Sequence, residues 1–204
     1  MQQDGSVVVR ATATDSHTIT SILSVGFMQD PMHRWLFPDE TERARLHPAF
    51  FAPLAAMALK DGEVWTTEDR SGTALWLPFD AAAADHGPGF RELFEPTLGT
   101  EYAARLGEFD RQSAGFHPAN RDHWYLAFIV VCPAVRGRGI GTALLRRRLE
   151  VLDREGTPAY LEATNLDSER LYRRFGFTRG DRTIDMPDGP SLYPMWREPR
   201  RPAT

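Results

Sequence analysis

The 204 residues, 42% hydrophobic and 25% charged, are enough for one globular domain, and no stretch approaches the roughly 18 apolar residues that span a bilayer. Cys132 is the only cysteine, which excludes an intrachain disulfide, and the six histidines lack metal-ligand spacing, so we expect no metal site. The net charge of −4, the pI of about 5.9 and the lack of a basic tail argue against a nucleic acid partner. The sequence shows no secretion signal, so we expect a cytoplasmic protein with no membrane contact.

The first part of the chain alternates strand and helix patterns. A strand opens it, an amphipathic helix follows and ends before Asp30-Pro31, and a longer helix is interrupted near Pro48 and Pro53. A hairpin then turns within 69–72. The predicted elements are strands over 7–12, 62–67 and 73–77 and helices over about 15–29 and 40–59.

Residues 80–121 are the least regular part, with helical periodicity that predicts two short helices. An insertion of this kind before a central strand often forms a lid or a substrate wall. A packed helical cover has about the same weight.

The second part predicts a strand–helix–strand unit over 124–164, which should be a right-handed parallel crossover. The predicted elements are strands over 124–132, 159–164, from 176 onward and over 191–197, and helices over 138–154 and 167–175. Together these patterns indicate a single α/β domain over 1–204 with a mixed sheet.

A loop rich in Gly and Arg lies between the apolar run that ends at Pro133 and the next helix. Backbone N–H groups at a helix N-terminus favour a bound anion, and glycines let a phosphate approach the backbone. The segment 136–182 holds eleven Arg against seven acidic residues, which suits a polyanionic cofactor, although Arg146–Arg148 are expected to form a solvated helix face. The loop lacks the Lys-Ser/Thr of a Walker A motif, and Thr142 breaks a dinucleotide fingerprint.

Arg136-x-x-Gly139-x-Gly141 after a strand resembles the acetyl-CoA motif of the GNAT N-acetyltransferase superfamily. The segment from Asn165 to Phe177 is similar to that superfamily's second motif, with Ser168 where Ala is usual. The resemblance covers about residues 123–180, and the flanks, with Tyr160-Leu161-Glu162-Ala163-Thr164, are similar to a bacterial branch of puromycin-type small-molecule acetyltransferases.

The resemblance implies a GNAT fold: a central, mixed but mostly antiparallel twisted sheet of about seven strands, flanked by helices, with the 80–121 insertion before the central strand. It also implies acetyl-CoA, or coenzyme A, as the ligand of the loop. The strand would bulge at Ile129–Val131 and part from its neighbour, leaving the Val131 N–H as oxyanion donor. The residues expected to contact the cofactor are Ile129, Val130, Val131, Arg136, Gly137, Arg138, Gly139, Ile140, Gly141, Thr142, Asn165, Ser168 and Tyr172.

The expected catalytic residues are Tyr172 and Glu162. A phenol with a pKa near 10 is protonated at neutral pH and can supply a proton to the leaving thiolate. Glu162 is the preferred base, with pairing to an Arg on the sheet face as the equal alternative. Five further residues are candidates for contact with the substrate: Trp35, Phe37, His123, Tyr125 and Tyr193.

The sequence therefore predicts an enzyme that moves an acetyl group from acetyl-CoA to a primary amine of a small molecule by direct attack in a ternary complex. Two alternatives stay open, a peptide or protein N-terminal acetyltransferase and a non-catalytic acyl-CoA-binding module. Exposed strand edges make a homodimer reasonable.

Overall fold

The computed structural model describes residues 7–82 and 89–200, and its centre is a mixed sheet of eight strands. The strands are β1 (Val8–Arg10), β2 (Glu63–Thr67), β3 (Gly72–Phe79), β4 (His123–Val131), β5 (Ala159–Ala163), β6 (Thr178–Arg179), β7 (Ile184–Asp185) and β8 (Ser191–Arg197). The order is β1-β2-β3-β4-β5-β8-β6, with β7 also paired to β8, and among the described strands only β4 and β5 pair in parallel. The predicted mixed, mostly antiparallel sheet is confirmed, with one strand more than expected.

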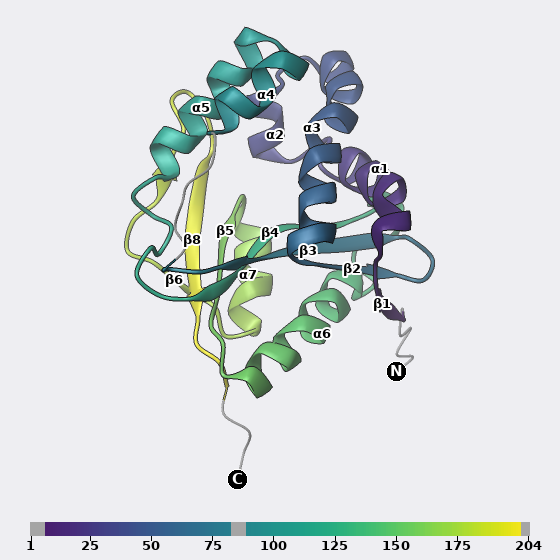
Figure 1. The fold of residues 1–204 in the computed structure, drawn as a ribbon, viewed down its shortest axis with the longest axis vertical. Helices are drawn as coiled ribbons and strands as arrows, with labels where there is room; N and C mark the ends of the chain where they lie inside the picture. Colours follow the sequence, from purple (N-terminus) through teal and green to yellow (C-terminus); the bar gives the residue numbers. More distant parts are fainter. Residues whose placement is uncertain (1–6, 83–88, 201–204) are drawn as a thin grey trace.

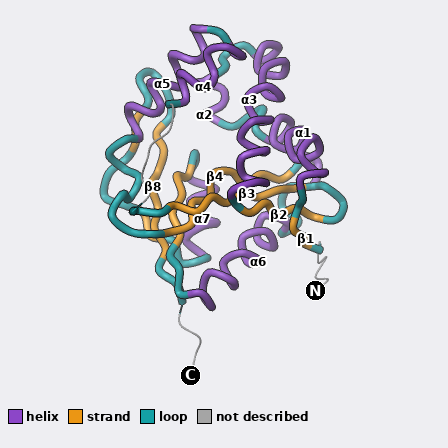
Figure 2. The backbone as a smooth tube through the Cα atoms, in the orientation of Figure 1, coloured by secondary structure: helices purple, strands orange, loops and turns teal. Residues whose placement is uncertain are grey.

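Helices cover both faces of this sheet (Figure 1). They are α1 (Ser16–Gly26), α2 (Pro31–Leu36), α3 (Glu40–Asp61), α4 (Phe90–Leu98), α5 (Thr100–Ser113), α6 (Ile140–Glu155) and α7 (Leu166–Arg174). Figure 2 shows α6 below the central strands, with α1 and α3 above them. Two apolar cores result, one between the sheet and α1–α5 and one between the sheet and the helices α6 and α7.

α2 was not predicted from the sequence, and α3 is continuous where an interruption was expected. Asp30 begins α2 rather than only ending the previous helix: its Oδ1 accepts hydrogen bonds from the N–H groups of Met32 (2.9 Å) and His33 (3.3 Å), and Pro31 occupies the first helical position. α3 continues through Pro48 and Pro53. Both prolines are exposed, so water can bind the carbonyl groups that they leave without an N–H partner.

Arg148 was wrongly predicted to be solvated. Its side chain is 1% exposed and forms ion pairs with Glu63 (3.0 Å) and Glu155 (3.4 Å). The guanidinium carbon lies 4.1 Å from the centre of the Trp124 ring. Arg148 therefore connects α6 to the buried side of the sheet.

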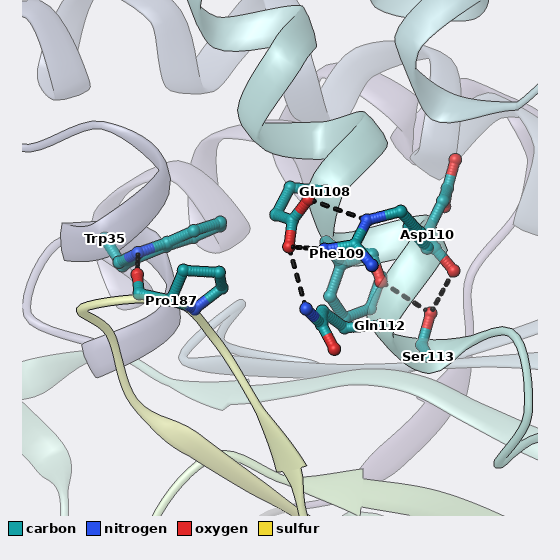
Figure 3. A network of polar contacts seen from close by, with 8 residues as sticks. Trp35, Glu108, Phe109, Asp110, Gln112, Ser113 and Pro187 are labelled. Atoms are coloured by element: carbon teal, nitrogen blue, oxygen red, sulfur yellow. Dashed lines mark hydrogen bonds and ion pairs between the residues drawn. The ribbon is translucent and has the colours of Figure 1, made fainter.

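The predicted helical insertion consists of α4 and α5, while its residues 83–88 lie outside the described part of the chain. Figure 3 shows α5 beside the turn that joins β7 to β8. There the Trp35 indole N–H donates to the carbonyl of Pro187 (2.9 Å), and Gln112 donates to Glu108 (2.8 Å) within α5. The Arg105 guanidinium of α5 donates to the Trp35 carbonyl of α2 (2.7 Å), and α5 also contacts β7, so the insertion packs over α2 and the end of the sheet.

Candidate active site

The centre of the site is the place where β4 and β5 part. The two strands pair only at Trp124–Ala159 and Tyr125–Tyr160, whereas β5 pairs with β8 along its whole length. On its other edge, β4 has one extra residue, Ala127, because Trp76 pairs with Leu126 and Leu75 with Phe128. The bulge therefore lies at Ala127, earlier than the expected Ile129–Val131, and the expected separation of the strands is present.

This bulge determines which backbone groups face the gap. Before it, the Trp124 N–H donates toward β5, to the Pro158 carbonyl (3.0 Å), whereas after it the Cys132 N–H donates toward β3, to Ser71 (2.8 Å). Successive N–H groups of a strand point to opposite edges. The N–H groups of Ile129 and Val131 therefore point away from β3 and into the gap.

The glycine-rich loop leads from β4 into α6. Gly137 and Gly139 have φ of +81° and +84°, and a Cβ on either would meet no atom within 4 Å, so these glycines are needed for the backbone turn and leave open space above it. Gly139 is the N-cap of α6 and supplies no side-chain cap, which leaves the first N–H groups of the helix, from Ile140 to Thr142, available to a ligand.

The two arginines of this loop differ in their contacts. The Arg136 guanidinium donates to the carbonyls of Val131 (3.3 Å) and Gly26 (2.8 Å) and so anchors the loop to β4 and α1. Arg138 is exposed beside the uncapped helix end. We therefore assign a structural role to the Arg136 side chain, while Arg138 keeps its positive charge free for an anion.

Asn165 and Ser168 lie at the start of α7, across the gap from β4. The Asn165 Oδ1 accepts from the Ser168 N–H (2.8 Å), so Asn165 caps this helix, two residues before the predicted start at 167. The Ser168 hydroxyl donates to the Asn165 carbonyl (2.9 Å). Both predicted contact residues thus have structural bonds of their own.

A cavity of about 130 Å³ lies between the sheet and the α1–α5 layer. Its walls are mostly apolar, and the insertion contributes Phe90, Leu106 and Phe109. The bulge places both Ala127 and Phe128 in the wall. The polar side chains that line it are His33, Tyr125, Glu162 and Thr164.

Glu162 is the carboxylate of this cavity. Its neighbours Leu161 and Ala163 face the opposite core, as the alternation of a strand requires. The Tyr125 hydroxyl donates to Glu162 Oε2 (2.7 Å), and no described arginine forms an ion pair with Glu162, so the predicted alternative of an Arg pair is wrong. Burial raises the pKa of Glu162 above its usual range, against the lowering effect of the Tyr125 hydrogen bond.

Tyr125, beside Glu162, and Tyr172, on α7, are both kept neutral. Burial raises the pKa of Tyr125 well above 10, and the charge of Glu162 adds to this effect. Tyr172, on α7, is 6% exposed, and burial followed by the charge of Asp30 raises its pKa as well. Tyr172 is therefore a protonated phenol throughout the neutral range.

Asp30 joins the α1–α2 turn to the end of β5. The Thr164 hydroxyl donates to Asp30 Oδ2 (2.6 Å), while the other carboxylate oxygen caps α2. Sequence analysis missed Asp30, Thr164 and His33 as parts of the site. The signal for Asp30 was present, because Asp followed by Pro is typical of a helix start.

The remaining predicted substrate residues lie away from the cavity. Phe37 is fully buried (0% exposed) against His47 and Phe50, and Tyr193 is on the opposite face of the sheet, under the guanidinium of Arg179. His123 is buried, and its ring nitrogens contact the Arg121 carbonyl (2.8 Å) and His117 (3.0 Å). Trp35 lines a separate surface hollow with Arg105. Only Tyr125 of the five borders the cavity.

Among the described residues, no group of three potential metal ligands lies together, and none of the helices there combines the length and hydrophobicity needed to cross a membrane.

Comparison with known proteins gives the family. The pattern of the Acetyltransferase (GNAT) family matches residues 107–177, and an acetyltransferase of Agrobacterium fabrum is 30% identical over 112 residues, which are 48% of this chain and 80% of that protein. The chain belongs to the GNAT acetyltransferase family. An uncharacterized N-acetyltransferase of Schizosaccharomyces pombe is 25% identical to this GNAT enzyme over 189 residues, 82% of this chain and 72% of that protein.

Solved structures agree with this assignment. A Corynebacterium glutamicum structure described as histone acetyltransferase HPA2 and related acetyltransferase has a TM-score of 0.70 at 26% identity, covering 97% of this chain and 98% of that one. Arylalkylamine N-acetyltransferase 2 of Aedes aegypti shares the fold, with a TM-score of 0.71 at 14% identity and coverage of 95% and 99%. None of these relatives is a puromycin N-acetyltransferase, so that narrower resemblance stays a prediction.

GNAT enzymes generally use acetyl-CoA, and the chemistry of this site fits that ligand. An uncapped helix N-terminus with open space above two glycines suits a pyrophosphate. The exposed backbone edge of β4 suits an extended amide chain, which can bind as an added strand does. The residues that would hold the cofactor are thus those of the loop and of β4 after the bulge.

Proposed function

We propose that the chain acts as one catalytic domain that transfers an acetyl group from acetyl-CoA to the primary amine of a small molecule with a compact apolar body. The observation that carries the proposal is the cavity at the point where β4 and β5 part, which is apolar except for a few side chains and is lined by the half-buried carboxylate Glu162. A volume of about 130 Å³ is close to that of the apolar cavity of about 150 Å³ that binds benzene. One ring or a short alkyl group fits this space.

The proposed chemistry uses three groups of this chain. Glu162, with its raised pKa, takes a proton from the ammonium group directly or through a water, because a base with a pKa closer to neutrality is the more effective one. Bound acetyl-CoA supplies the acyl thioester. The Val131 N–H, which faces the gap, stabilises the negative charge that develops on the acetyl oxygen. The Tyr172 hydroxyl gives its proton to the departing thiolate.

The site also argues for an order of preference among amines. A polyamine would place a second positive charge in an apolar cavity with a single lining carboxylate, which is costly without a partner. A peptide N-terminus would need room for the first side chain and for the chain that follows it. We therefore expect a ring-bearing or short alkyl amine to react best.

The test is free-thiol release from acetyl-CoA with phenethylamine, hexylamine, spermidine and a short peptide, on the wild type and on Tyr172→Phe. We expect release with phenethylamine or hexylamine and a kcat at least about tenfold lower in the variant. Release only with the peptide would favour an N-terminal acetyltransferase. Tight acetyl-CoA binding without release from any amine would favour a binding module and contradict the proposal.

A further inference from the structure

Two buried histidines form a hydrogen-bonded chain behind the cavity. His47 Nδ1 lies 2.8 Å from the carbonyl oxygen of Ser24, and His47 Nε2 lies 3.2 Å from His33 Nδ1. A carbonyl oxygen can only accept, so His47 carries its proton on Nδ1. In a neutral ring the Nε2 of His47 is then an acceptor, and His33 must donate to it from Nδ1.

Both rings are neutral. His47 is 0% exposed and His33 is 4% exposed. Burial lowers the pKa of each, and for His33 the charge that a protonated His47 would carry and the charge of Arg43 lower it further. A neutral His33 has one proton, which the chain fixes on Nδ1. Its Nε2 is therefore a bare acceptor.

The Nε2 of His33 has no hydrogen-bond donor among the described residues, although His33 lines the cavity. The other lining polar groups are engaged: the Tyr125 hydroxyl donates to Glu162, and the Thr164 hydroxyl donates to Asp30. Glu162 belongs to the sheet wall and His33 to α2 in the helical wall. The cavity thus has a carboxylate on one wall and an unused acceptor on another.

We propose that His33 is a specificity-determining residue whose Nε2 accepts a hydrogen bond from a donor on the body of the substrate amine, such as a phenolic hydroxyl. The proposal rests on the proposed function, because it assumes that the cavity holds the amine. An unpaired acceptor in an apolar cavity is unfavourable once water is displaced, so a substrate that supplies a donor is preferred over one that does not. His47 is a positioning residue that sets the tautomer of His33.

The test compares kcat/KM for tyramine, phenethylamine and 4-methoxyphenethylamine, which share a ring and differ in the group at its far end. We expect tyramine to exceed phenethylamine by about tenfold, in line with the cost of an unpaired buried acceptor, and the methoxy compound, which has no donor, to be the poorest. In His33→Phe the ratio of kcat/KM for tyramine to that for phenethylamine should fall to near one, whatever the change in the absolute rates.

A matched pair at His47 separates tautomer control from packing. His47→Gln keeps an amide oxygen for His33 and an amide N–H for the Ser24 carbonyl, so the tyramine preference should be retained, whereas His47→Leu should lose it. Equal kcat/KM for tyramine and phenethylamine in the wild type would overturn the inference and leave the proposed function intact. No acetylation of any amine would instead reject the proposed function.

The tautomers of His33 and His47 can also be measured on the wild-type protein, so this test does not depend on the folding of a variant. Imidazole ¹⁵N NMR of histidine-labelled protein distinguishes protonated from bare ring nitrogens. We expect both His33 and His47 as Nδ1–H tautomers with bare Nε2. A proton on Nε2 of His33 would overturn the inference whatever the kinetics show.

Discussion

Gly141 allows a ligand-binding role of the loop to be separated from a folding role. It is the second residue of α6, and a Cβ there would lie 3.7 Å from Leu171 Cδ2 and 3.8 Å from Val131 Cγ2, which are ordinary van der Waals distances. Gly141→Ala therefore has room in the folded protein. Since alanine loses less backbone freedom on folding, we expect a gain of about 0.5–1 kcal/mol in the free energy of unfolding, which corresponds to roughly 1–4 °C in Tm.

The same methyl group would enter the mouth of the gap, between Val131 on β4 and Leu171 on α7. If the pyrophosphate of coenzyme A lies against the first turn of α6, the methyl group holds it away from the N–H groups. We expect the Kd for coenzyme A to rise at least about tenfold, equivalent to about 1.4 kcal/mol. Differential scanning fluorimetry and isothermal titration calorimetry on the same preparations measure the two effects.

Gly139→Ala is the matched control. Its φ of +84° is strained for alanine although the space beyond is open, so this variant should lose about 1–2 kcal/mol of stability. A Gly141→Ala protein that gains stability and binds coenzyme A as the wild type does would refute the assignment of the loop as the phosphate site.

Two further predictions concern buried charges. Glu162→Gln should lower kcat by at least about 10²-fold, because the base is lost, and it should raise Tm at pH 8. Burial raises the pKa of Glu162, so the ionised side chain destabilises the native state above its unfolded-state pKa, and the difference in Tm between variant and wild type should vanish near pH 4. A pH series of melting curves checks this, and equal Tm values at pH 8 would contradict it. Arg148→Met should reduce the free energy of unfolding in urea by about 2 kcal/mol, less than the roughly 3–5 kcal/mol of fully buried pairs, because Glu63 and Glu155 reach solvent; a protein of wild-type stability would show that these ion pairs contribute little.

The sequence predicts most of the sheet because its signals there are local. The apolar run before Pro133, the glycines after it and the periodicity of the next helix each depend on neighbouring residues, and β4, the loop and α6 lie within a few residues of their predicted positions. The acidic cap and the prolines of α2 and α3 are also local, but their effect depends on packing: Pro48 and Pro53 stay within one helix because both face water.

The parts that could not be predicted are contacts between distant segments. Arg148 is buried because Glu63 on β2, which is distant in the sequence, lies 3.0 Å from it in the fold. The pair of His33 and His47 exists because α2 packs on α3, and neither residue carries a signal of its own. Phe37 and Tyr193 were candidates for substrate contact by residue type, but strand alternation and core packing placed them elsewhere.

The bulge at Ala127 links local and long-range structure. Its one extra residue reverses the alternation of β4, both for the direction of the backbone N–H groups and for the sheet face that each side chain occupies. In the backbone it directs the N–H groups of Ile129 and Val131 toward the gap instead of β3. In the side chains it lets Ala127 and Phe128 both face the cavity, whereas strict alternation would send one of them to the opposite core. The proposed oxyanion donor is thus a backbone group fixed by strand register, and β4 needs no polar side chain between Tyr125 and Cys132 to supply it.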